Sequence, residues 1–231
     1  MLKLLNVNKL VIKSAFILFG ASLLSTANAF VVGTATQGTG NCYPFGCTDW
    51  QPEYQQIYDS SAFSSEISIN SLTFYNTVFD SGNYDANYGT YNIWLSTTSA
   101  GVDNLSSVAS DNYGIDNTLV YSGSLTGVGQ FGGSMDIILD TVFDYDFTQG
   151  NLLMSVTSTD ATRSSRSLFF DDQDSFGDET SRLFGSNRTD SLGLVTGFNE
   201  AGVDVPEPSS LALLGLGLAG IGLARRKKLA A

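Results

Sequence analysis

The side chains of this sequence that could do chemistry are almost all carboxylates. Two groups of aspartates stand out, one in "FFDDQDSFGDET" and one in "DTVFDYDF". Calcium binds six to eight oxygen atoms from carboxylates, amides and backbone carbonyls, so both groups are candidate calcium ligands. Neither follows the EF-hand spacing, so the sequence favours ordinary acidic turns and keeps calcium as the alternative. The candidate ligands are Asp171, Asp172, Asp174 and Asp178 in the first group, and Asp140, Asp144 and Asp146 in the second.

The residue types that are missing exclude many enzyme mechanisms. The chain has no histidine, which removes Ser-His-Asp triads, histidine bases and histidine metal ligands. No lysine lies between Phe30 and Val205, so a Schiff-base lysine and a Ser-Lys pair are excluded there. A glycosidase needs only two carboxylates, but among 22 acids some pair will be suitably spaced by chance. We therefore expect a protein that is not an enzyme, with a carboxylate-dependent glycoside hydrolase as the alternative.

The charge of the same segment limits its partners. Four arginines face 22 acids there, so its net charge is −18 within a chain of net charge −12. Such a body is repelled by nucleic acid, because phosphate neutralisation needs Lys and Arg. It could attract divalent cations. We expect no cofactor, calcium being the one candidate, and no nucleic-acid partner.

Aromatic side chains offer another binding chemistry, which is stacking on sugar rings. Trp94 lies opposite the apolar stripe of its expected strand, as a sugar-stacking residue would. The sequence nevertheless favours ordinary burial on both faces of a sheet, with a calcium-assisted carbohydrate-binding module as the alternative. The aromatic candidates are Trp50, Trp94, Tyr84, Tyr88 and Tyr91.

The only two cysteines stand five residues apart in "GNCYPFGCTDW". Pro44 and Gly46 make the intervening loop prone to turn. Two thiols are too few for a structural zinc site, and exported proteins usually oxidise paired cysteines. We expect a structural disulfide between Cys42 and Cys47 that fastens one loop.

The elements that must position these residues are short β-strands. "TYNIWLST" places Tyr91, Ile93 and Leu95 on one side, and "EISINSLTFYN" alternates on either side of a step at Asn70–Ser71. The same period of two recurs in "SMDIILD" and "NLLMSVTST", while "SLFFD" and "LGLVTGF" are expected to be closing strands. No segment shows a helical stripe. This pattern predicts an all-β fold, a two-sheet antiparallel sandwich of the jelly-roll kind.

The N-terminal residues 1–29 have the features of a secretory signal peptide. Three lysines precede a short apolar run, which is followed by Ala27-Asn28-Ala29. Small residues at Ala27 and Ala29 suit the −3 and −1 pockets of signal peptidase. We expect a signal helix that is removed after Ala29, leaving Phe30 as the first residue of an exported domain, 30–204.

The C-terminal residues 205–231 combine three parts. Pro206, Glu207 and Pro208 form an extended tripeptide. An uncharged Leu/Gly/Ala run follows, long enough to form a short transmembrane helix. A basic cluster that stops transfer ends the segment: Arg225, Arg226, Lys227 and Lys228.

These three parts in this order resemble a PEP-CTERM sorting segment. The resemblance implies recognition and cleavage near the tripeptide by exosortase, a membrane cysteine peptidase of Gram-negative bacteria that usually make exopolysaccharide. The body, with "YQQIYDSSAF" early and "FDYDFTQGNLL" late, is similar to a recurrent PEP-CTERM body with a β-sandwich fold.

We therefore expect a non-catalytic exported protein whose processing partners are signal peptidase and exosortase. Its precursor would be anchored transiently in the inner membrane. The mature protein would reach the cell surface or the extracellular matrix, associated with exopolysaccharide or biofilm.

Overall fold

The computed structural model describes residues 29–34, 38–47, 53–77, 86, 88–125, 133–162, 167–185 and 187–200. The expected signal helix and the sorting helix lie outside these residues. Within the described part, no helix has the length and apolar character needed to cross a membrane.

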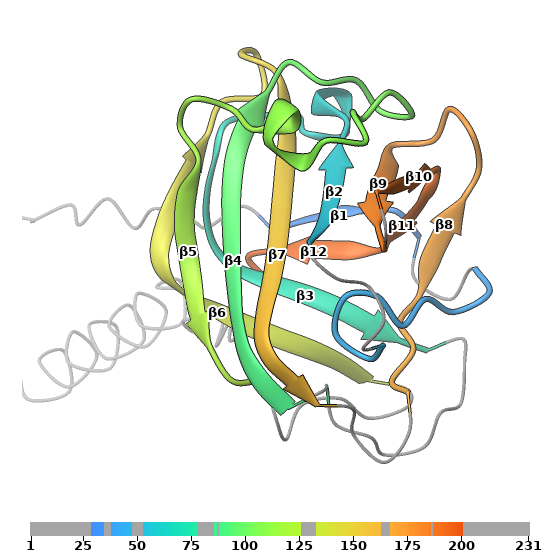
Figure 1. Cartoon of the computed structure of the whole chain (residues 1–231). Coiled ribbons are helices and arrows are strands. Elements are labelled where there is room, and N and C mark those ends of the chain that lie inside the picture. The colour runs from blue at the N-terminus through green and yellow to red at the C-terminus, as the bar shows by residue number, and fades with distance from the viewer. Residues whose placement is uncertain are drawn as a thin grey trace, which may run out of the picture.

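Antiparallel strands form most of the described chain (Figure 1). Two short 3-10 helices, η1 (Ser60–Ala62) and η2 (Ala109–Asn112), are the helical elements of this part. The strands are β1 (Phe30–Val32), β2 (Tyr54–Tyr58), β3 (Ile67–Asn76), β4 (Tyr88–Thr98), β5 (Thr118–Gly123), β6 (Gly133–Tyr145), β7 (Asn151–Thr162), β8 (Asp172–Asp174), β9 (Thr180–Phe184), β10 (Arg188–Asp190), β11 (Leu192–Leu194) and β12 (Thr196–Phe198).

The strands form two main sheets and one small one. The four-stranded sheet has the order β1-β12-β3-β6, and the six-stranded sheet has the order β10-β9-β2-β7-β4-β5. A two-stranded sheet joins β11 to β8. In Figure 1 the strands of the four-stranded sheet run across those of the six-stranded sheet, with β5 beside β6 at one corner. The antiparallel all-β fold predicted from the sequence is confirmed, and two sheets facing one core have the arrangement of a sandwich.

The main core between the two sheets is rich in aromatic rings. Phe45 contacts Phe74, Tyr91 and Phe170, with ring centroids 5.0 to 5.9 Å apart. Their tilted and edge-on arrangement is the one that aromatic quadrupoles favour. A smaller apolar cluster lies on the other face of the six-stranded sheet, under the β4–β5 connection: Ile57, Leu105, Leu153 and Leu183.

The strand pattern expected from the sequence is largely confirmed. Tyr91, Ile93 and Leu95 are all fully buried on one face of β4. The expected step in β3 is a β-bulge, where the pairing with β6 shifts between Ile69 and Ser71. A bulge inserts one extra residue, which turns the following side chains to the other face.

Two of the expected closing strands differ from the prediction. The segment "SLFFD" is not a strand, because its ladder pairing is limited to an isolated bridge between Phe170 and Asn41. The segment "LGLVTGF" is two strands, because β11 pairs with β8 whereas β12 pairs with β1 and β3. An alternating pattern shows which residues are buried, but it does not show which sheet buries them.

The Gln56 side chain binds the backbone of Leu194, at the end of β11, just before the chain enters β12 of the four-stranded sheet. Its Oε1 accepts a 2.8 Å hydrogen bond from the Leu194 backbone N–H, and its Nε2 donates a 2.8 Å bond to the Leu194 carbonyl. The Tyr54 hydroxyl donates to the same Oε1 at 2.7 Å. Burial raises the pKa of Tyr54 above its usual value, so this phenol stays a neutral donor. The amide thus replaces a backbone partner in a fully buried position.

The neighbouring Gln55 side chain lies on the opposite face of β2 and holds the β4–β5 connection, residues 99–117. Its Nε2 donates to the Ala109 carbonyl at 3.0 Å, and its Oε1 accepts from Asn112 Nδ2 at 2.7 Å. Asn112 in turn accepts from the Ser106 N–H at 2.8 Å. This chain of hydrogen bonds fixes the loop over the smaller apolar cluster.

The substitution Gln56→Leu tests the importance of this amide. It leaves the Leu194 N–H and the Tyr54 hydroxyl without their partner in the core, at about 1–3 kcal/mol for each group. We expect the free energy of unfolding in urea to fall by about 2–6 kcal/mol. The control Gln149→Leu changes an exposed glutamine and should alter stability by less than about 0.5 kcal/mol. Equal effects of both substitutions would show that the amide has no special role.

Candidate functional site

The two consecutive aspartates of the first acidic group serve to hold loops. Asp172 is fully buried, and its Oδ1 accepts from the backbone N–H groups of Thr39 and Gly40, both at 2.8 Å. Asp171, also fully buried, accepts from the Thr77 N–H at 2.7 Å and from the Thr77 hydroxyl. Asp172 thus fastens the N-terminal loop to β8, and Asp171 fastens the end of β3.

Asp178 and Asp174, the other members of this group, do not hold distant loops as Asp171 and Asp172 do. Asp178 accepts from the N–H groups of Thr180 at 2.9 Å and Ser175 at 3.1 Å, which closes the β8–β9 turn. Asp174 is exposed. Among the described residues, no three Asp, Glu, Cys or His side chains meet as a group that could hold a metal ion.

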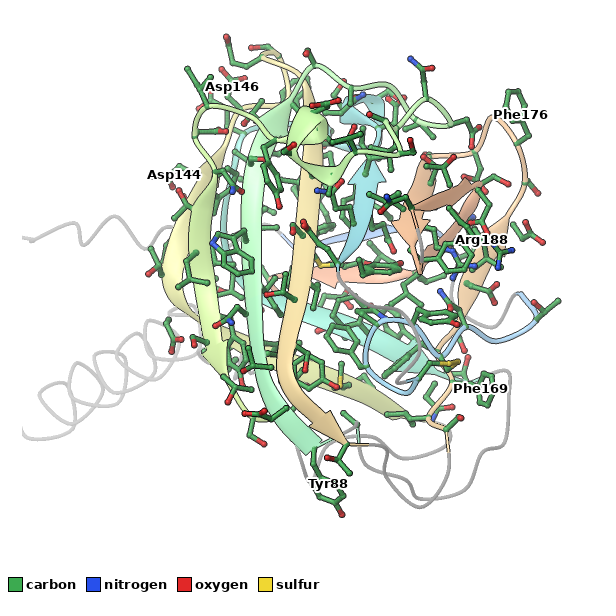
Figure 2. All side chains as sticks on the ribbon, viewed as in Figure 1. Tyr88, Asp144, Asp146, Phe169, Phe176 and Arg188 are labelled. Carbon is green, nitrogen blue, oxygen red and sulfur yellow. A yellow bond between two sulfur atoms is a disulfide. The ribbon has the colours of Figure 1, made fainter. Side chains whose placement is uncertain are left out.

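The second acidic group borders a groove on the four-stranded sheet. The groove has a volume of about 440 Å³. Asp144 accepts from the Ser68 hydroxyl at 2.6 Å, and Asp146 accepts from the Thr148 N–H at 2.9 Å. Asp144 and Asp146 lie near each other at the edge of the molecule in Figure 2. Asp140 lies elsewhere, where it joins the sheets by accepting from the Ser122 N–H at 3.0 Å. The lining residues of the groove are Glu66, Ile67, Ser68, Asp144, Tyr145 and Asp146.

A second, smaller pocket of about 120 Å³ lies between the β4–β5 connection and the β9–β11 region. Phe176 at its rim is 87% exposed and points away from the body in Figure 2. One carboxylate oxygen of Asp103 faces buried surroundings without a hydrogen-bond partner, while the other accepts from the Gly177 N–H at 2.8 Å. The volume of this pocket would admit a small polar group, but it is too small to enclose both faces of a sugar ring.

The aromatic candidates are divided by the fold. Tyr91 is fully buried, and its hydroxyl donates to the Phe45 carbonyl at 3.3 Å, so the burial favoured from the sequence is confirmed for this residue and the alternative of sugar stacking is wrong. Tyr88 is 49% exposed at the start of β4, and Trp94 is half-buried. Trp50 and Tyr84 lie outside the described residues.

The cations of the described part converge on one ring. The Arg182 Cζ lies 3.9 Å from the centroid of the Phe184 ring, and the Arg188 Cζ lies 5.0 Å from it. Arg182 is also paired with Asp190, with Nε to Oδ1 at 2.8 Å. This arrangement holds β10 against β9 through one ion pair and cation–π contacts.

The cysteines are joined as a disulfide between Cys42 and Cys47, with Cα atoms 5.2 Å apart. The Gly46 and Cys47 N–H groups both donate to the Cys42 carbonyl. The bridge closes a tight loop whose Phe45 ring enters the main core. The bridge therefore fastens a single loop, as expected from the sequence.

Sequence reasoning missed the residues on which this arrangement depends most. Gln55 and Gln56 look like ordinary polar positions of a strand, although two fully buried glutamines in succession are unusual. Asn199, 1% exposed, was likewise missed. Its left-handed backbone, with φ of 61°, favours asparagine. For the two glutamines the available signal was the pair "QQ" inside an expected strand.

Comparison with known proteins identifies the C-terminal segment. Residues 204–228 match the family described as "PEP-CTERM protein-sorting motif". The match ends at Lys228, the last residue of the basic cluster. No curated protein and no solved structure matches the chain. The chain therefore carries a PEP-CTERM sorting motif, which implies export, processing at the membrane and delivery to the cell surface.

Two aspartates of the first acidic group, the buried Asp172 and the half-buried Asp178, predict a pH dependence of stability. Burial is the main cause that raises the pKa of Asp172, and it also raises the pKa of Asp178, above the usual 3.8. A carboxyl that binds its proton more tightly when folded stabilises the fold as the pH falls. We expect the melting temperature to rise as the pH is lowered from 7 towards 4.

The substitution Asp172→Asn isolates the contribution of this group. It keeps an oxygen for the Thr39 and Gly40 N–H groups but cannot titrate, so the slope of melting temperature against pH should become flatter. The exposed Asp111→Asn serves as the control and should leave the slope unchanged. An unchanged slope in Asp172→Asn would contradict the assignment.

Calcium should act on this body only as a general screening ion. The loop-holding aspartates already accept backbone hydrogen bonds, and folding gathers a charge of −18 that any salt screens. We expect calcium chloride and sodium chloride of equal ionic strength to raise the melting temperature equally. A saturable rise at micromolar calcium that Asp172→Asn with Asp174→Asn abolishes would instead establish a specific site.

Proposed function

We propose that this chain is a non-catalytic exported protein that exosortase releases from a transient inner-membrane anchor. The observation that carries this proposal is the sorting motif at residues 204–228. The signal-like residues 1–29 at the opposite end supply the export step. In this proposal the mature body, 30–204, stays at the cell surface or in the extracellular matrix.

The roles of the body's carboxylates support a non-catalytic reading. Asp171, Asp172 and Asp178 accept hydrogen bonds from loop backbone. A hydrolase needs two carboxylates that face a substrate cleft, one to donate a proton and one to attack or activate water. The carboxylates engaged in loops are not available for either step.

The groove beside Asp144 suits association with exopolysaccharide or biofilm. Its carboxylates can accept hydrogen bonds from sugar hydroxyls, and the exposed ring of Tyr88 supplies stacking surface elsewhere on the same body. The groove is also what a carboxylate-dependent hydrolase or a calcium-assisted carbohydrate-binding module would use. A glycan array with the purified body tests whether it binds polysaccharide. Binding only in the presence of calcium would favour the calcium-assisted module. Sugar release from a bound glycan would favour the hydrolase.

Processing in an exosortase-positive host tests the sorting function directly. We expect the intact mass of the mature protein to lack residues 1–29 and the transmembrane segment from Leu211 to Ala231. The double substitution Pro206→Ala with Pro208→Ala should leave the sorting segment attached, because it removes the fixed extended backbone of the tripeptide. The matched control Pro52→Ala should be processed normally. A mature protein that retains the sorting segment in such a host would refute the proposal.

A further inference from the structure

The last described residues, Asn199 and Glu200, are fixed to the sheet by their own side chains. Asn199 follows β12 and occupies the bulge of β3. Its Oδ1 accepts from the Asn70 N–H at 2.8 Å, its Nδ2 donates to the Ser68 carbonyl at 2.9 Å, and its backbone N–H donates to the Ser71 carbonyl at 3.0 Å. These three bonds give partners to backbone groups of β3 beyond Leu72, where its ladder with β12 ends at Phe198.

The residue after it is fixed as well. The Tyr75 hydroxyl donates to the Glu200 carboxylate. That carboxylate lies over Gly197, where a Cβ would come within 2.6 Å of Glu200 Oε2 and 2.8 Å of the Tyr75 hydroxyl. The absence of a side chain at Gly197 therefore makes room for this pair. Preceding both, Phe198 is fully buried, with its ring centroid 5.1 Å from that of Tyr58.

These contacts set the length of chain between the body and the sorting motif. The matched motif starts at residue 204 and its first proline is Pro206. Five residues, 201–205, separate Glu200 from Pro206, so the Cα atoms of these two residues lie at most about 22 Å apart. A membrane peptidase that cuts near the tripeptide must therefore work close to the surface of the folded body.

We infer that Asn199, Tyr75 and Glu200 are positioning residues for sorting, which fix the point where the sorting segment leaves the body and the length of its tether. They do not touch the reacting bond and act only through the tether. The inference rests on the proposed function, since it assigns these residues to the exosortase step.

Varying the tether in an exosortase-positive host tests the inference. Deleting Ala201-Gly202-Val203 shortens the tether to two residues and brings the body against the peptidase. We expect pulse-chase processing to slow by at least about tenfold, because small misplacements at a reacting bond cost large factors in rate. Replacing the same three residues by Ser-Gly-Ser keeps the length and should leave the rate unchanged.

Releasing the fixed residues should restore processing of the shortened chain. Adding Asn199→Gly and Tyr75→Phe to the deletion removes the side-chain bonds while glycine still permits the positive φ. We expect the rate to return to within about threefold of the wild type, because two more residues join the tether. The melting temperature of each body shows whether the variant folds. If Asn199→Gly prevents folding, Tyr75→Phe alone is combined with the deletion.

The outcomes separate the two proposals. Wild-type protein that stays unprocessed refutes the sorting function itself. Normal processing of the wild type together with a normal rate in the deletion variant overturns only the positioning role. A slowed deletion variant that folds but is not restored by releasing the fixed residues also overturns it.

Discussion

The double hydrogen bond between the Gln56 amide and the Leu194 backbone is the interaction on which the rest of the fold depends. The chain leaves one sheet after β11 and joins another at β12, and such a change leaves backbone groups without ladder partners. Gln56 supplies those partners from the centre of β2. The next residue back, Gln55, does the same for the β4–β5 connection on the opposite face. One dipeptide thus joins the end of β11 and the β4–β5 connection to opposite faces of a single strand.

The acidity of the body is partly architectural. Loops expose backbone N–H groups, and a carboxylate is a strong acceptor for them. Asp171, Asp172 and Asp178 each hold loop backbone in this way, and Asp116 accepts from the Thr97 N–H at 2.8 Å. The acids therefore stabilise turns locally, while the repulsion between their negative charges opposes folding. No lysine lies between Phe30 and Val205 to offset this repulsion. Export into a medium containing salt relieves part of this repulsion.

The sequence predicted local features well and long-range ones poorly. Alternation in β4 and the step in β3 were recognisable because a strand's period of two is a property of neighbouring residues. The loop-holding role of Asp172 was not, because its partners Thr39 and Gly40 are more than 130 residues away. For the same reason the groove beside Asp144, which also needs Glu66 just before β3, could not be assembled from spacing. The splitting of 192–198 into two strands was not predictable either, because the partners of these strands, and the Gln56 amide that binds Leu194 from 138 residues away, are distant in the sequence.

The pairing of β1 with β12 has a mechanical consequence. Phe30 lies opposite Phe198, so the first and last strands of the described residues meet at one edge. If the mature protein is held through its C-terminal end, the pulling force enters along β12, which is flanked by β1 on one side and β3 on the other. A force along a strand loads the ladders on both sides in shear, so their hydrogen bonds share it and do not open one at a time. A grip on both ends would instead peel β1 away from β12, so the domain resists tension from its C-terminal attachment far better than separation of its two ends.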